Sequence, residues 1–151
     1  MSDLDDLYQN IILDHNRRPR NYGPMPDATH KADGHNPLCG DEVTVFLHIE
    51  GDTIEKVSFD GQGCAISKAS ASLMTLRLKG RSIEDAKRAI SEVRALLSGT
   101  EQTAPDLESM GDLAALAGVR KFAVRVKCAT LAWHTLEAAL AGRRLVSTEE
   151  N

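Results

Sequence analysis

Hydrophobic and polar positions in the N-terminal part of the chain predict an amphipathic helix followed by a β-hairpin. In residues 4–15 the apolar side chains recur three and four positions apart, as on one face of a helix. From residue 43 the pattern changes to alternation. Residues 43–50 and 53–59 are therefore predicted as strands joined by the two-residue turn Gly51-Asp52. A further short strand is expected at 29–33.

The rest of the chain is predicted to be mostly helical. We expect helices over 65–79, 82–97, 113–117 and 128–141, with a loop over 99–111. The buried stripe of the first helix should hold Ile66, Ala69, Leu73 and Leu76, and that of the last Trp133, Leu136 and Leu140. Strands that precede helices are typical of the α+β class. We therefore predict one domain, 1–151, in which helices pack on one face of a small antiparallel sheet of two to three strands.

Composition narrows the classes of function. The net charge of −4, the sequence pI of about 5.7 and the aromatic content of 4% argue against a nucleic-acid-binding protein. No apolar run approaches the roughly 20 residues that span a bilayer, and the acidic start lacks the features of a signal peptide. We therefore expect a cytoplasmic protein without a membrane partner, whose thiols stay reduced or bind metal.

The candidate chemistry lies in three cysteines and one aspartate: Cys39, Asp41, Cys64 and Cys128. Three sulfurs and one oxygen form a donor set that zinc prefers in tetrahedral sites, although soft thiolates also suit iron–sulfur chemistry. Cys64 and Cys128 are expected at the starts of two helices, where the helix dipole favours the thiolate. Cys39 is expected in a loop flanked by proline and glycine. These residues leave open a structural metal, a cluster or the transfer of sulfur.

Charge compensation adds a second expectation. Zinc with three thiolates and one carboxylate carries a net charge of about −2, which is costly where the site is partly buried. Arg125, Lys127 and Lys68 flank the candidate ligands in sequence. We hypothesise that at least one of Arg125 and Lys127 points at the site. The five histidines are expected to be ordinary core or surface residues.

Three phrases carry a resemblance to a known family: Pro37-Leu38-Cys39-Gly40-Asp41, Gly63-Cys64-Ala65-Ile66-Ser67 and Val126-Lys127-Cys128-Ala129. Together they resemble the U-type proteins of iron–sulfur cluster assembly, which are IscU-like and related to the NifU N-terminal domain. The resemblance covers nearly the whole chain and implies a SufE/NifU-like fold.

Two departures from the IscU pattern resemble the SufU branch of that family. Lys127 stands where IscU-like scaffolds have a histidine, and the segment before Cys128 is longer. The resemblance implies a Zn²⁺ ion held by Cys39, Asp41, Cys64 and Cys128. It also implies that the protein is a sulfurtransferase. Cys39 would accept persulfide sulfur from a pyridoxal-phosphate (PLP) cysteine desulfurase of the SufS type. A downstream Suf cluster-assembly scaffold would then receive the sulfur.

Two alternatives remain open beside this interpretation. The same cysteines would form a [2Fe–2S] cluster, or bind iron, if the protein is a cluster scaffold. They would hold zinc permanently if the site is purely structural. In the transfer interpretation, Cys39 leaves or loosens from the metal when the partner docks, and a partner side chain such as a histidine takes its place.

Overall fold

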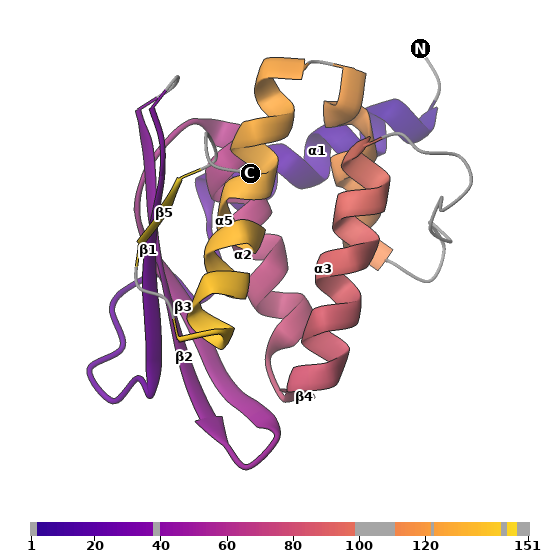
Figure 1. Ribbon diagram of the computed structural model, residues 1–151. Helices are drawn as coiled ribbons and strands as arrows, with labels where there is room; N and C mark the ends of the chain where they lie inside the picture. The colour runs from indigo at the N-terminus through magenta and orange to yellow at the C-terminus, as the bar shows by residue number, and fades with distance from the viewer. Residues whose placement is uncertain (1–2, 38–39, 99–110, 122, 143–144, 148–151) are drawn as a thin grey trace.

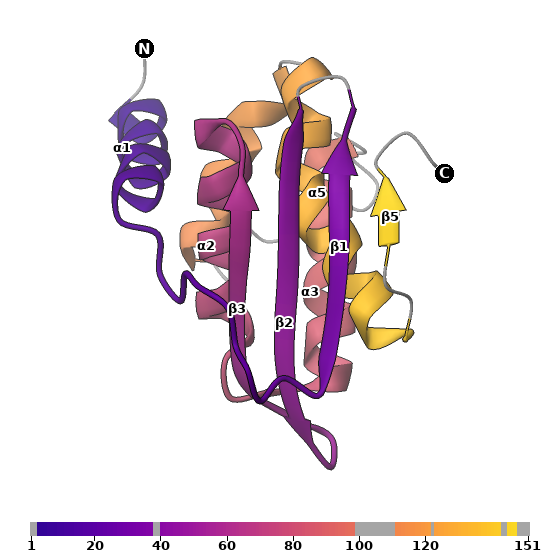
Figure 2. The same cartoon turned by 90° about the vertical axis from the view of Figure 1, so that its left-hand side faces the viewer.

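A five-stranded sheet with helices on one of its faces forms the fold (Figures 1 and 2). The computed structural model describes residues 3–37, 40–98, 111–121, 123–142 and 145–147. Its elements are α1 (Asp3–Arg17), β1 (His30–Asn36), β2 (Asp41–Glu50), β3 (Thr53–Gln62), α2 (Ala65–Leu78), β4 (Arg81–Ser82), α3 (Ile83–Ser98), the 3-10 helix η2 (Gly111–Lys121), α5 (Ala123–Leu140) and β5 (Leu145–Ser147).

The sheet has the strand order β4-β3-β2-β1-β5, in which neighbouring strands are antiparallel except for the parallel pair β1 and β5. The turn Gly51-Asp52 joins β2 to β3 as predicted, because Glu50 pairs with Thr53. Alternate residues of β2, such as Val43 and Leu47, are buried against the helices.

The predicted α+β class, with helices on one face, is confirmed, although the sheet has more strands than the two to three expected. The additional strands β4 and β5 span two and three residues. Elements this short carry no recognisable alternation of apolar and polar side chains. No helix among the described residues is long and apolar enough to cross a membrane.

Helix α2 packs against α5 through small and hydroxyl-bearing residues. The Ser70 hydroxyl donates to the Ala129 carbonyl over 2.6 Å and accepts from the Trp133 indole N–H over 3.1 Å. The prediction that Leu76 belongs to the buried stripe is wrong, since this residue is 49% exposed. Hydrogen-bonded serines and threonines occupy part of the buried face of α2, and hydrophobic spacing alone does not reveal them.

The last helix begins earlier than predicted. Helix α5 starts at Ala123, so Cys128 lies in its second turn and not at its N-terminus. By contrast, the predicted start of the helix over 82–97 agrees with that of α3, because the Ser82 hydroxyl accepts from the Asp85 backbone N–H over 3.0 Å and caps this helix. The missed start of α5 changes the electrostatic account of Cys128.

Candidate metal centre

Three of the four candidate ligands meet at one end of the sheet, where β2 begins, β3 passes into α2 and α5 runs close behind β1 (Figure 2). One donor atom each from Asp41, Cys64 and Cys128 lies within 4.8 Å of the other two. Asp41 and Cys128 are buried, and Cys64 is half-buried. Cys39 lies outside the described residues.

Two glycines let the β3–α2 junction carry Cys64 to this corner. Gly61 has a φ of +127°, and a Cβ at this position would lie 2.2 Å from the carbonyl oxygen of Glu42 on the neighbouring strand. A Cβ on Gly63 would lie 2.9 Å from Asp41 Oδ1. The absence of both side chains therefore allows the close approach between the start of β2 and this junction.

Cys64 caps the N-terminus of α2, in agreement with the helix predicted to begin at residue 65. Its Sγ accepts from the Ser67 backbone N–H over 3.5 Å, and its own backbone N–H donates to Asp41 Oδ1 over 2.9 Å. The Cys64 thiol is 3.7 Å from the second carboxylate oxygen, Oδ2. The carboxylate of Asp41 is thus oriented by a main-chain donor, which a buried anion requires.

Cys128 is held in a different way from the one predicted. Because it lies in the second turn of α5, its thiol is removed from the unpaired amides of the first turn. Asn36, at the end of β1, donates from Nδ2 to Cys128 Sγ over 3.8 Å. Our sequence interpretation did not single out Asn36. Its pairing with Asp41 across β1 and β2 places both side chains on the same, helix-covered face of the sheet.

The three basic residues that flank the candidate ligands in the sequence differ in exposure and in the groups they contact. The Cys64 thiolate, together with hydrogen bonding to Cys128, raises the pKa of the exposed Arg125 guanidinium. Lys127 is half-buried. Lys68 lies with Nζ 5.8 Å from the centroid of the Tyr22 ring, so it makes a cation–π contact with that ring. Arg125 is therefore a cation in position to offset the charge of the two thiolates.

The three described donors fit a zinc ion. Tetrahedral zinc with a Zn–S bond of about 2.3 Å and a Zn–O bond of about 2.1 Å separates a sulfur ligand from an oxygen ligand by about 3.6 Å, close to the 3.7 Å between Cys64 Sγ and Asp41 Oδ2. Two sulfurs and one carboxylate oxygen from three separate elements would supply three ligands to such an ion. The donor chemistry is that of zinc or iron and not of a hard cation such as magnesium.

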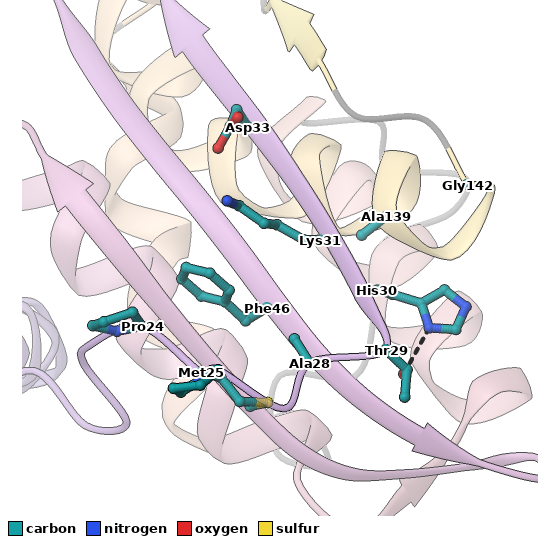
Figure 3. Close-up of a pocket in the computed structure, with 11 residues that line it drawn as sticks. Pro24, Met25, Ala28, Thr29, His30, Lys31, Asp33, Phe46, Ala139 and Gly142 are labelled. Atoms are coloured by element: carbon teal, nitrogen blue, oxygen red, sulfur yellow. Dashed lines mark hydrogen bonds between the residues drawn. The ribbon is translucent and has the colours of Figure 1, made fainter.

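Two other features of the described residues lie away from this centre. His48, Glu50 and Glu55 form a second cluster near the far end of the β2–β3 hairpin, where His48 Nδ1 donates to the Asp27 carbonyl oxygen over 2.8 Å. A cavity of about 560 Å³ is lined by residues that include Met25, Lys31 and Phe46 (Figure 3). None of Asp41, Cys64 and Cys128 lines this cavity.

Known proteins resemble this chain over most of its length. A zinc-dependent sulfurtransferase SufU from Bacillus subtilis (strain 168) is 42% identical over 140 residues, which are 93% of this chain and 93% of that protein. An iron–sulfur cluster assembly scaffold protein IscU from Streptococcus pyogenes serotype M1 is 37% identical over 140 residues, covering 93% of this chain and 86% of the relative.

Solved structures share the fold. A candidate iron–sulfur cluster assembly scaffold protein for the SUF system, FiSufU from Fervidobacterium islandicum AW-1, superposes with a TM-score of 0.80 at 34% identity, covering 86% of this chain and 93% of that one. A NifU-like N-terminal protein from Brucella abortus has a TM-score of 0.80 at 22% identity, covering 93% of this chain and 96% of that one, and it supports the fold alone. Residues 7–129 match the NifU-like N terminal domain. The chain therefore belongs to the NifU-like N-terminal domain family.

Proposed function

We propose that this protein is a zinc-dependent sulfurtransferase of iron–sulfur cluster assembly, which accepts sulfur on Cys39. The observation that carries the proposal is the convergence of Asp41, Cys64 and Cys128, with donor atoms within 4.8 Å of one another. Cys39 would be the fourth ligand, two positions before Asp41 in the sequence. The 42% identical relative is itself named a zinc-dependent sulfurtransferase.

A bound zinc ion would keep its cysteine ligands deprotonated at neutral pH, which is the form that accepts sulfur. In the proposed reaction the Cys39 thiolate attacks the outer sulfur of a persulfide on the active-site cysteine of a desulfurase. The S–S bond of that persulfide breaks, and the desulfurase cysteine leaves as a thiolate. Cys39 becomes a persulfide, so no external oxidant or reductant is needed.

Asp41, Cys64 and Cys128 would hold the ion during this transfer. The Asp41 carboxylate is fixed by the Cys64 backbone N–H, and the Cys64 sulfur by the Ser67 backbone N–H. The Arg125 guanidinium offsets the negative charge of the ligands and faces solvent. We propose a PLP-dependent cysteine desulfurase of the SufS type as the sulfur donor, a downstream Suf scaffold as the receiver, and the cytoplasm as the location.

Cysteine turnover by a purified SufS-type desulfurase tests the proposal. Zinc-loaded protein should stimulate turnover strongly, whereas the Cys39→Ala variant should remain folded and give no stimulation. Equal rates with the two proteins, or no stimulation by either, would contradict sulfur acceptance through Cys39. Cys39→Ala should also unfold less readily than Cys64→Ala. A purely structural zinc site would instead make the two variants equally unstable.

A cluster scaffold is the second candidate, because the 37% identical relative is named an IscU scaffold. In that case the three cysteines would assemble a [2Fe–2S] unit in place of holding zinc. Anaerobic reconstitution with iron and sulfide distinguishes the candidates. A stable cluster that transfers to an apo-ferredoxin would favour the scaffold, and a protein that retains zinc and forms no cluster would favour sulfur transfer.

A further inference from the structure

Strand β1 and helix α5 approach each other more closely than side chains normally allow. At Gly34 a Cβ would lie 2.0 Å from Thr135 Oγ1 and 3.3 Å from Leu131 Cδ1. Thr135 is itself fully buried, and its hydroxyl donates to the Leu131 carbonyl of the same helix over 2.7 Å. The missing side chain at Gly34 therefore sets the separation between this strand and this helix.

The same strand–helix contact continues to the metal centre. Asn36 follows Gly34 by two positions, so both face α5. Cys128 precedes Thr135 by seven positions, which is about two helical turns and returns to the same face of α5. The contact between Gly34 and Thr135 is thus followed, toward the metal centre, by the contact between Asn36 and Cys128. The close approach at Gly34 brings the short asparagine side chain within reach of the thiol.

Asn36 ends in an amide whose Nδ2 donates to Cys128 Sγ over 3.8 Å, and its side chain is completely buried. An N–H donor stabilises negative charge on sulfur without adding a ligand to the metal. The sulfur of Cys64 has a comparable donor in the Ser67 backbone N–H. Partners of this kind fix the position of a ligand and tune its affinity for the ion.

We propose that Asn36 is a positioning residue of the metal centre, whose N–H···S hydrogen bond keeps the Cys128 sulfur on the ion. The inference rests on the proposed function, because it concerns the ligands that stay when Cys39 takes up sulfur. It explains how a thiol in the second turn of a helix is oriented without the amides of a helix N-terminus.

Zinc affinity of Asn36→Ala, measured by competition with a chromophoric chelator, tests the inference. We expect the dissociation constant of zinc to rise about 10- to 100-fold, as for other residues that support a metal ligand. Thr135→Ala is the matched control, because it truncates a buried side chain in the same β1–α5 interface away from the sulfur. Cobalt substitution gives a second readout, since the thiolate-to-cobalt absorption should shift in Asn36→Ala and stay unchanged in Thr135→Ala.

The Asn36→Asp variant covers the case in which Asn36→Ala does not fold. It keeps the shape of the side chain and replaces the amide donor with a carboxylate oxygen, so it should also weaken zinc binding. Wild-type zinc affinity in a folded Asn36 variant, or an equal loss in Thr135→Ala, would overturn the inference. Desulfurase stimulation by the wild-type protein is a separate result. Its absence would count against the proposed function and would leave the role of Asn36 in zinc binding to the affinity measurement.

Discussion

Replacing Gly63 with alanine should weaken zinc binding more than it destabilises the fold. A Cβ at Gly63 would lie 2.9 Å from Asp41 Oδ1, 3.1 Å from its Cγ and 3.2 Å from Ser67 Oγ. Ordinary van der Waals contact begins at 3.4 Å. The Asp41 carboxylate therefore has to move away by about 0.5 Å, because it would otherwise overlap with the new methyl group.

The size of the effect follows from what Asp41 does. Its Oδ1 accepts from the Cys64 backbone N–H over 2.9 Å, so a shift of the carboxylate disturbs one proposed ligand and the orientation of another. Overpacking of this kind costs about 1–3 kcal/mol, and we expect the lower end because the atoms in contact belong to side chains and can move. Disturbing the support of a metal ligand lowers affinity about 10- to 100-fold, and we expect at least the lower figure here.

The assay compares Gly63→Ala with Gly118→Ala. At Gly118 a Cβ would meet no heavy atom within 4 Å, which makes it a control for the glycine-to-alanine change itself. Chelator competition gives the zinc dissociation constant, and thermal unfolding of the metal-free proteins gives the cost to the fold. Wild-type zinc affinity in Gly63→Ala would refute the reasoning, as would an equal loss of affinity in Gly118→Ala.

Three further predictions follow from the same structure. Arg125→Glu should weaken zinc binding about two- to fivefold at low salt and by less at high salt. The control variant Arg88→Glu, on the exposed surface of α3, should leave zinc affinity unchanged. Burial lowers the pKa of His15 from its usual 6.5, so the unfolded chain binds the proton more readily than the folded protein. Stability to urea should therefore fall as the pH drops below 6.5, and His15→Gln should make stability depend less on pH in that range. Ser70→Ala removes the acceptor of the Trp133 indole N–H and should lower the free energy of unfolding by about 1–3 kcal/mol, measured by urea denaturation.

Local signals in the sequence were sufficient where a single residue determines a turn or a cap. Gly51-Asp52 can form a two-residue turn, and its position sets the register of β2 against β3. Ser82 precedes acidic residues at the start of α3, and it caps that helix. Such features depend on neighbours in the chain, so they are visible without knowledge of the fold.

Other features depend on contacts between distant segments, and the sequence did not reveal them. Our interpretation placed the start of the last helix at Cys128, whereas α5 begins at Ala123. Leu76 was assigned to the core because it is apolar, but it is exposed. The side of α2 that its neighbours bury carries Ser72, whose hydroxyl lies 2.7 Å from His15 Nδ1. Asn36 precedes a proline and resembles a loop residue, whereas pairing with β2 buries it.

The position of the donors bears on which role the site can play. Asp41 belongs to the central strand β2, Cys64 caps α2 and Cys128 lies within α5, so each described donor is fixed by an element that also builds the core. A metal held by three such donors can stay in place when a fourth ligand exchanges, because none of the three has to move. The sulfur-transfer hypothesis requires donors that stay in place, and a structural zinc site can use them as well. The comparison of Cys39→Ala with Cys64→Ala is therefore the experiment in which the two roles differ most.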